Sequence, residues 1–360
     1  MRYPSVDILR TVAIVVMVLV HFSENLSGYY LPFAGLGAPL FTFLSGASYR
    51  LWLNGQERRQ VSDEEISKIS VRRGLFVFGI GFAFNIFVWL PEDTFNWDVL
   101  TFIGAALLLL NLVRRLPLSV AVLIAIMSYL ISPVLRALVD FPAYWENGYF
   151  ECDLTLTEVL TGFLLTGYFP FLPWITYSLT GFVAATLLFS QSQAEKPSIW
   201  PTAILGGVLI VAANAMLQLR VYAPATITTY VLTGWSMFPP SMEYMLATIG
   251  MALLLFSLSH RYVDQNQELP RDWPLFRLVK TFSRYAFTIY LIHHVVHLWP
   301  LWIYGLATGN EATHFWQQAM PTVYALPLGI LFLAICYLIL RRLDPDERYG
   351  MEGWMRWLCD

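Results

Sequence analysis

Runs of about 20 apolar residues, the length a helix needs to cross a bilayer, recur along the chain and are separated by polar residues or by Pro and Gly. This pattern predicts an all-α, polytopic membrane protein whose spanning helices lie near residues 6–27, 32–53, 71–91, 97–113, 117–139, 170–190, 199–218, 240–261, 276–299 and 320–340. A further apolar stretch, Thr157–Tyr168, is too short to span. We expect it to lie at the interface or to enter as a re-entrant segment.

Positive residues occupy alternate connections between these helices. They are Arg58, Arg59, Lys68, Arg72, Arg73, Arg114, Arg115, Lys196, Arg261, Arg271, Arg341, Arg342, Arg348 and Arg356, whereas Arg136 and Arg220 fall on the opposite side. The opposite loops, 91–97, 140–158 and 300–318, are acidic and aromatic. The positive-inside rule therefore predicts that both termini are cytoplasmic.

Composition agrees with a membrane protein, because 57% of residues are hydrophobic and 13% are charged, against roughly 25% charged in soluble domains. We expect one membrane domain, 1–360, with a short cytoplasmic tail, 341–360.

The first apolar run contains Arg10 and His21 and lacks an A-x-A cleavage site, which indicates a retained helix and not a signal peptide. The net charge of -3 disfavours nucleic acid as a partner. Cys152, Cys336 and Cys359 are too scattered for a disulfide framework or a metal knuckle.

The first helix carries four ionisable residues, Asp7, Arg10, His21 and Glu24, on one side. Each costs roughly 2.5 to 3.5 kcal/mol on insertion scales, so such residues tend to mark pathways, sites or structural pairs. Asp7 and Arg10 have the spacing of an intrahelical ion pair or of a snorkelling structural pair. His21, about 16 Å further along, is either a packing residue or a functional one. Glu24 either orients its imidazole or is solvated at the helix end.

Two later segments add polar residues. In the second helix Thr42, Ser45 and Tyr49 share a face and Gly46 permits close helix approach. In the ninth, His293 and His297 are one turn apart, but no acidic residue accompanies them as in H-E-x-x-H. We therefore expect no metal, and a polar cavity wall or an interfacial anchor instead.

Several segments resemble a known family. Arg10, ten residues and His21 resemble the R-x10-H motif of the transmembrane acyltransferase superfamily, and LSG at 44–46 resembles its second-helix motif. NWDVLTFIGAALLL (96–109), YFPFLPWITYSLTGF (168–182), PPSMEYMLATIG (239–250), FSRYAFTIYLIHHVV (282–296) and ERYGMEGWMRWL (347–358) are similar to segments of heparan-alpha-glucosaminide N-acetyltransferase-like bacterial proteins. The resemblance covers nearly the whole chain.

This resemblance implies an acyl-CoA-dependent O- or N-acyltransferase. The donor, acetyl-CoA or another acyl-CoA, is cytoplasmic, and the acceptor is a glycan or a lipid-linked hydroxyl or amine. His21 would be the catalytic histidine, Arg10 its motif partner, and His293 the histidine of the Y-L-x-H segment. The lysosomal branch carries Asn at the position of His21 and its active-site histidine later, where this chain has none. The aminosugar acceptor of that branch is therefore not carried over.

A histidine is suited either to act as general base or to carry the acyl group transiently, and the resemblance favours the base. Asp7 and Glu24 complete the predicted catalytic stripe. Coenzyme A phosphates need cations, and the candidates are Arg50, Arg72, Arg73, Lys280 and Arg284. Further donor or substrate contacts are expected from Ser45, Trp174, Tyr290 and His293.

Two rival interpretations remain. The stripe of Asp7, Arg10, His21 and Glu24 would also suit a proton-coupled secondary transporter, although no internal repeat supports one. A catalytically silent scaffold with the same fold is the other. The resemblance implies a bacterial cytoplasmic (inner) membrane location. The sequence leaves the oligomeric state open, a homodimer included.

Overall fold

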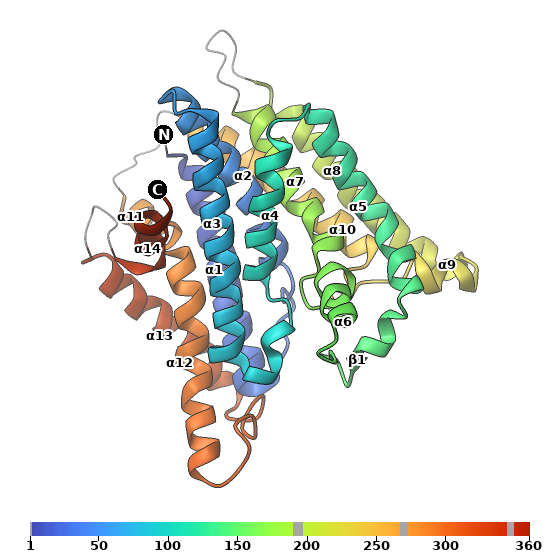
Figure 1. Cartoon of the computed structure of the whole chain (residues 1–360), viewed down its shortest axis with the longest axis vertical. Coiled ribbons are helices and arrows are strands. Elements are labelled where there is room, and N and C mark those ends of the chain that lie inside the picture. Colours follow the sequence, from blue (N-terminus) through green and yellow to red (C-terminus); the bar gives the residue numbers. More distant parts are fainter. Residues whose placement is uncertain (1, 190–196, 267–272, 344–348) are drawn as a thin grey trace. The chain divides into compact units, whose positions relative to one another are not determined.

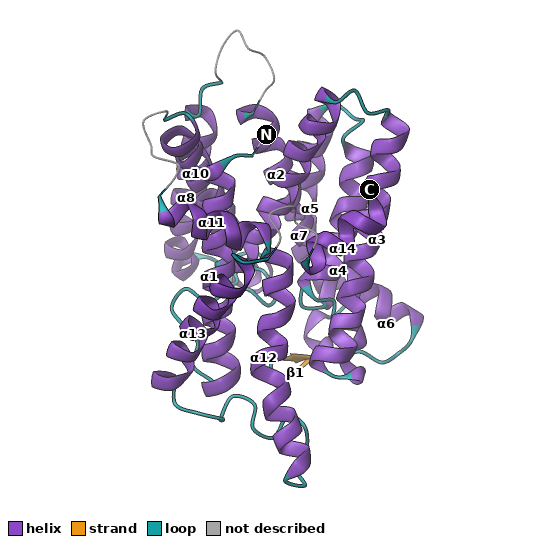
Figure 2. Ribbon diagram, turned by 90° about the vertical axis from the view of Figure 1, so that its left-hand side faces the viewer, coloured by secondary structure: helices purple, strands orange, loops and turns teal. Residues whose placement is uncertain are grey.

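The computed structural model describes residues 2–189, 197–266, 273–343 and 349–360, and it is mainly helical (Figures 1 and 2). Lys196, Arg271 and Arg348, which were used to predict the orientation, lie outside these residues. The chain forms two compact units, Thr42–Gln265 and Arg2–Phe41 with Asn266–Leu358. Each unit is described by itself below. A single domain over 1–360 stays a prediction.

The first unit contains most of α2 (Gly37–Arg58), then α3 (Asp63–Phe84), α4 (Val99–Val113), α5 (Leu118–Leu138), α6 (Leu156–Thr161), α7 (Phe171–Leu188), α8 (Trp200–Leu219), α9 (Ala225–Tyr230) and α10 (Met242–Ser259). Two strands of two residues each, β1 (Trp145–Glu146) and β2 (Tyr149–Phe150), form an antiparallel hairpin. Within this unit α3 packs on α4, α5 on α7, and α8 on α10. Side chains start the helices locally: Ser62 caps α3 and Asp98 caps α4.

The second unit contains α1 (Pro4–Ser27), α11 (Pro274–Arg284), α12 (Ala286–Ala307), α13 (Thr322–Leu340) and α14 (Gly350–Cys359). The helix α1 packs against α11, α12 and α13. Proline at the first position starts α1, and Gly28, at φ +68, ends it in the left-handed conformation that glycine adopts without strain. The candidate site lies where α1 faces α12.

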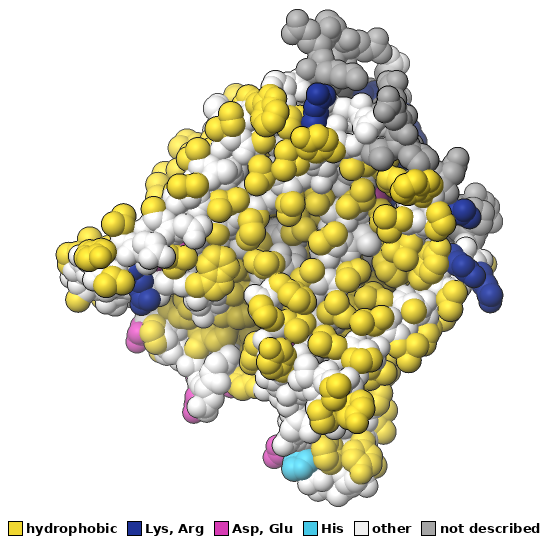
Figure 3. All heavy atoms as spheres, turned by 180° about the vertical axis from the view of Figure 1, so that it is seen from behind, with side chains coloured by type: hydrophobic (Ala, Val, Ile, Leu, Met, Phe, Trp, Pro, Cys, Tyr) yellow, Lys and Arg dark blue, Asp and Glu magenta, His cyan; other side chains and the backbone are white. Residues whose placement is uncertain are grey.

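Within the described residues, nine helices are long and apolar enough to cross a membrane. Apolar side chains such as Leu123, Val134 and Val211 are exposed on them, and such side chains cover much of the face in Figure 3. Lipid is the solvent that suits such a surface. The fold-class prediction of an all-α polytopic membrane protein is confirmed.

Each of the ten predicted spans coincides with helical structure, with two differences. The helix expected at 32–53 is present as α2, but Arg50, Asn54 and other polar residues keep it outside the nine. The crossing by α2, and with it the cytoplasmic placement of both termini, therefore stays a prediction. The stretch at 157–168 contains the short helix α6 and a π-helical turn, Gly162–Thr166, and its place at the interface or as a re-entrant segment stays a prediction.

The second difference is that the run predicted at 276–299 is two helices. It breaks at Tyr285, between α11 and α12. At the break the carboxylate of Glu352 on α14 accepts hydrogen bonds from the backbone N–H groups of Phe287 (2.7 Å) and Thr288 (3.2 Å). These are donors at the start of α12 that a continuous helix would satisfy with its own carbonyls. A side chain distant in sequence therefore caps α12.

Candidate functional site

Four histidines gather between α1 and α12 in the second unit. His21 lies on α1, and His293, His294 and His297 lie on α12. The ring of His21 stacks on that of His293, with centroids 5.2 Å apart, and its centroid lies 4.5 Å from that of His294. The three α12 rings are buried. The structure thus brings together His21 and His293, which the sequence singled out separately.

Hydrogen bonds define which nitrogen carries the proton in the rings of His21 and His293. Nδ1 of His293 lies 3.1 Å from the carbonyl oxygen of Ile289, and a carbonyl only accepts, so this nitrogen is the donor. In a neutral ring Nε2 of His293 is then an acceptor. It lies 2.9 Å from Nδ1 of His21, which must therefore donate. The proton of neutral His21 is on Nδ1, and its Nε2 carries the lone pair.

The hydrogen-bonded chain continues along α12 to α1. Nδ1 of His297 donates to the carbonyl oxygen of His293, 2.5 Å away. Nε2 of His297 is then the acceptor for the side-chain amide of Asn25, at 2.8 Å. Asn25 lies one helical turn beyond His21 and is buried. These bonds fix the rotation of the α12 rings against α1.

Asp7 and Arg10 are joined through a third residue. The Ser283 hydroxyl donates to a carboxylate oxygen of Asp7 at 2.6 Å and accepts from the guanidinium of Arg10 at 2.9 Å. Asp7 forms its ion pair with Arg2, also at 2.6 Å. The predicted pairing of Asp7 with Arg10 is thus indirect, and it ties α1 to α11.

Glu24 has a different neighbour from the one expected. The Tyr30 side chain hydrogen bonds to the Glu24 carboxylate, whereas the partner of His21 is His293. The imidazole of His293 therefore makes the orienting contact with His21 that was predicted for Glu24. Glu24 stays close to His21 in sequence, one turn along α1.

Arg284 and Tyr290 flank the site along α11 and α12. Tyr290 is buried, and its ring packs edge-on against His293 (5.7 Å) and His294 (5.9 Å). Arg284 ends α11 and is partly exposed. Burial, together with the charge of Arg2, lowers the pKa of Arg284 from its ordinary value.

Ser45, Arg50 and Trp174 belong to the first unit. The Ser45 hydroxyl donates to the Thr42 carbonyl (2.7 Å) and is 3.1 Å from the Ser178 hydroxyl. Arg50 pairs with Glu57 at 2.9 Å. Trp174 is fully buried. Its ring packs among aromatic residues of its own unit, including Phe169 at 4.8 Å.

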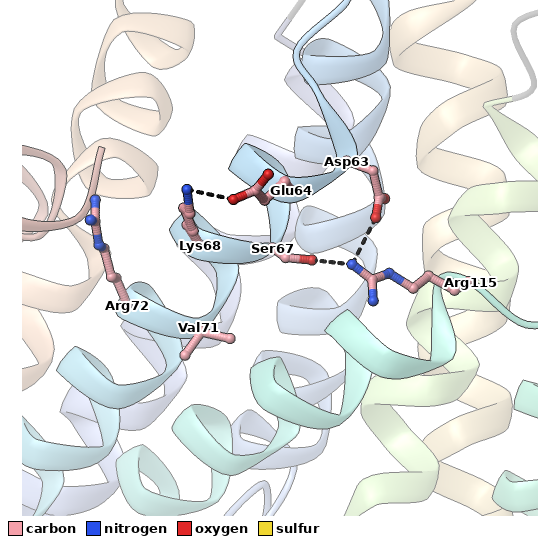
Figure 4. A pocket seen from close by; sticks show the side chains of 7 residues that line it. All are labelled: Asp63, Glu64, Ser67, Lys68, Val71, Arg72 and Arg115. Carbon is pink, nitrogen blue, oxygen red and sulfur yellow. Dashed lines mark hydrogen bonds and ion pairs between the residues drawn. The ribbon is translucent and has the colours of Figure 1, made fainter.

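A pocket of about 490 Å³ opens beside the start of α3 in the first unit (Figure 4). It is lined by Asp63, Glu64, Ser67, Lys68, Val71, Arg72 and Arg115. Two of its cations are paired, Arg115 with Asp63 at 2.7 Å and Lys68 with Glu64 at 2.8 Å. Arg72, one of the predicted phosphate-binding candidates, also lines it.

Three residues of the second unit were missed from the sequence: His294, Ser283 and Glu352. His294 follows His293 directly, and a second adjacent imidazole was the available signal. Ser283 and Glu352 are ordinary polar residues whose partners lie 276 and 64 or 65 positions away, so no local pattern indicates them.

Apolar spanning helices that enclose a hydrogen-bonded histidine pair define a polytopic membrane protein with an internal imidazole site. The model of the family "Heparan-alpha-glucosaminide N-acetyltransferase, catalytic" matches residues 2–222. The chain therefore belongs to this family of membrane acetyltransferases. The match includes Arg10 and His21 and ends before α12. A comparison with curated proteins found no match.

Proposed function

We propose that this protein transfers an acyl group, most simply acetyl, from cytoplasmic acyl-CoA to a hydroxyl or amine of a glycan or lipid-linked acceptor, with His21 as general base. One observation carries the proposal. The hydrogen bond from Nδ1 of His21 to Nε2 of His293 leaves the lone pair of His21 on Nε2. A base needs such an available lone pair within reach of the acceptor proton.

The proposed reaction is a direct transfer. Nε2 of His21 takes the proton of the acceptor O–H or N–H while the acceptor atom attacks the thioester carbonyl carbon. The C–S bond then breaks, and the departing coenzyme A thiolate takes the proton from His21. His293 accepts a hydrogen bond from Nδ1 of His21 throughout, so it orients the ring as the acidic residue of a catalytic triad does.

Arg10 and Asp7 are proposed to shape the cytoplasmic end of the donor path. Their contacts through Ser283 support a role in holding α1 against α11. The pantetheine arm spans roughly 15 to 20 Å when extended, which is similar to the helical rise between Arg10 and His21. Glu24 is proposed to act at the outer side of His21, with Tyr30 as its partner.

Cationic and aromatic side chains are proposed to hold the donor. Arg284 is supported by its partly exposed position at the end of α11, and Tyr290 by its contact with the histidines. Arg50, in the first unit, is a further candidate for the coenzyme A phosphates. Ser45 and Trp174, which are engaged within the first unit, are proposed as further donor or substrate contacts.

The deciding experiment measures coenzyme A release and acceptor labelling by purified protein in detergent. Radiolabelled acetyl-CoA and native envelope extract supply donor and acceptor. His21→Gln and His21→Ala are expected to lose about 10²- to 10⁴-fold in kcat, the usual contribution of a general base. Retention of full activity in either variant, at normal thermal stability, rules out His21 as the base.

The same assay separates the rival mechanisms. An acyl group found covalently on His21 after acid quenching would indicate an acyl carrier. Proton-coupled flux in liposomes without coenzyme A release would indicate a transporter. We expect neither, because the family is one of membrane acetyltransferases and the direct transfer needs no covalent intermediate. The proposed location is a bacterial cytoplasmic membrane, with coenzyme A reaching the protein from the cytoplasm.

A further inference from the structure

Three imidazole rings of the histidine cluster each bring one nitrogen close to the other two rings. One nitrogen of each of His21, His293 and His294 lies within 4.8 Å of the other two. Zinc binds imidazole nitrogen at about 2.0 to 2.1 Å, so tetrahedral ligands are roughly 3.4 Å apart. The 2.9 Å between His21 and His293 is already shorter than this. To close the site around an ion, the His21–His293 pair must therefore widen by about 0.5 Å, and the longest of the three separations must shorten by at most about 1.4 Å.

The chemistry of the donor set selects the kind of ion. Neutral imidazole suits zinc, copper, nickel and cobalt, whereas magnesium and calcium prefer oxygen ligands. Three histidines with a fourth position left for water are a ligand set found in zinc sites. His293 and His294 are almost completely buried, at 0% and 1% exposure, so water competes little for them.

The surroundings of His293 match those of a metal ligand. Its Nδ1 donates to the carbonyl oxygen of Ile289, and its Nε2 faces Nδ1 of His21. Ligand histidines typically hold their second nitrogen in this way. From the sequence, only His293 and His297 had the spacing to share a metal ion, and none was expected there. In the structure His297 instead binds Asn25, and His294 is the third member.

We propose that His21, His293 and His294 form a site for a divalent cation of the zinc class, and that the bound cation switches off the base. To bind through Nδ1, neutral His21 must move its proton from Nδ1 to Nε2, which removes the lone pair that accepts the acceptor's proton. No net proton is released in this shift. Cation binding is independent of the proposed acyl transfer, whereas the switching rests on it.

The binding test uses the full chain, purified in detergent without a polyhistidine tag and stripped with a chelator. Added Co²⁺ is expected to give the strong visible bands of a four-coordinate site, and Zn²⁺ to bind once per chain in equilibrium dialysis. His294→Gln is expected to weaken binding at least about tenfold, the lower end of the losses from changing residues that only support ligands. The matched control, His260→Gln with His314→Gln, removes the two histidines outside α1 and α12 and is expected to retain it.

Two results overturn the site: wild-type protein that binds neither ion, or His294→Gln protein that binds as tightly as wild type. If His294→Gln does not fold, X-ray absorption of the wild-type zinc complex decides. Three nitrogen ligands support the site, and oxygen ligands alone overturn it.

The switching is tested in the same preparations by acyl-transfer activity with and without Zn²⁺. Wild-type activity is expected to fall on adding Zn²⁺ and to return with chelator. In His294→Gln the ratio of the two activities is expected to stay near one. Bound metal with unchanged activity overturns the switching alone. Bound metal in a protein that transfers no acyl group under any condition overturns the proposed function and leaves the site standing.

Discussion

Nδ1 of His21 and Nε2 of His293 lie 2.9 Å apart, although the two residues are 272 positions apart in the chain. The bond joins α1, which carries the R-x10-H motif, to α12, which lies beyond the part of the chain that the family model matches. Because His293 is itself fixed by the carbonyl of Ile289, the arrangement has one direction. The proton donor is His21 and the acceptor is His293.

This direction predicts different effects for two changes at His293. Leucine removes the acceptor, so His293→Leu is expected to lower kcat by about 10²-fold, within the contribution of a general base. Glutamine can offer an oxygen to Nδ1 of His21, so His293→Gln is expected to recover part of this loss. KM for acetyl-CoA should change little in both, since the contact concerns the base. Steady-state kinetics at matched thermal stability provide the measurement.

Equal losses in the two variants, or a rise in KM without a fall in kcat, would contradict an orienting role. They would instead place His293 in donor binding or in packing. Imidazole ¹⁵N shifts of labelled protein give a second readout, because the Nδ1–H form of His21 should be lost in His293→Leu.

The fold was predictable because bilayer thickness sets helix length directly. Runs of apolar residues located the long helices, whereas the short helices α9 and α14 were not predicted. The break at Tyr285 was missed, although Arg277, Lys280 and Arg284 make the segment before it far more polar than α12. The residue that caps α12 there, Glu352, comes from another helix, so no local pattern indicates it.

The site was predictable only in part, for a similar reason. An ionisable residue such as Arg10 or His21 is easily recognised in an apolar helix, because it is costly to insert into a membrane. The residue that it contacts is not recognisable in the same way. Helical spacing suggested Arg10 for Asp7 and Glu24 for His21. The structure supplies Ser283 and His293 instead, from helices more than 250 residues away.

Ser283→Ala is expected to destabilise the protein. The Ser283 hydroxyl is buried between Asp7 and Arg10 and bonds to both. Without this hydroxyl, the charged side chains of Asp7 and Arg10 each lose one hydrogen-bond partner. This should lower the free energy of unfolding by about 1 to 3 kcal/mol. Thermal unfolding in detergent should show a lower midpoint. The partly exposed Thr281→Ala, on the same helix, is the control and should change the midpoint less. An unaltered midpoint in Ser283→Ala would mean that other contacts hold α1 to α11.

Removing the cap of α12 is expected to weaken the attachment of the C-terminal helix. The Glu352 carboxylate bonds to the backbone of Phe287 and Thr288 and to the Thr288 hydroxyl at 2.5 Å. Glu352→Ala should therefore cost about 1 to 2 kcal/mol, as loss of a helix cap does. Trp357→Ala changes an exposed residue of α14 and serves as control. Proteolysis of the C-terminal segment and thermal unfolding both report the effect.

The burial of Glu352 also predicts that the stability of the protein depends on pH. Burial raises the pKa of Glu352, against hydrogen bonds from Thr288 and Phe287 that lower it. The folded state then binds the Glu352 proton more tightly than the unfolded state, so this contribution to stability is complete below the unfolded pKa. It is lost as the pH rises through the folded pKa. Glu352→Gln stays neutral, so the stability of wild type relative to this variant should fall as the pH rises. A difference that is constant from about pH 4, near the ordinary pKa of glutamate, to pH 7 would refute the shift.

Substitution of Gly46, in the LSG segment, is expected to cause a packing defect. Gly55 of the same helix provides the control. A Cβ added at Gly46 would lie 1.8 Å from the carbonyl oxygen of Ser178 on α7, and one at Gly181 would lie 1.9 Å from that of Phe43. The two backbones touch, as small residues permit in membrane bundles, which confirms the close approach expected of Gly46. Gly46→Ala must push the helices apart because the obstacle is backbone. We expect the free energy of unfolding to fall by at least about 2 kcal/mol, as for overpacked cores.

At Gly55 of the same helix no atom lies within 4 Å of the added Cβ. Gly55→Ala should therefore be neutral or stabilising by up to about 1 kcal/mol, the helix preference of alanine over glycine. Equal thermal midpoints for the two variants would show that α2 and α7 do not pack through Gly46.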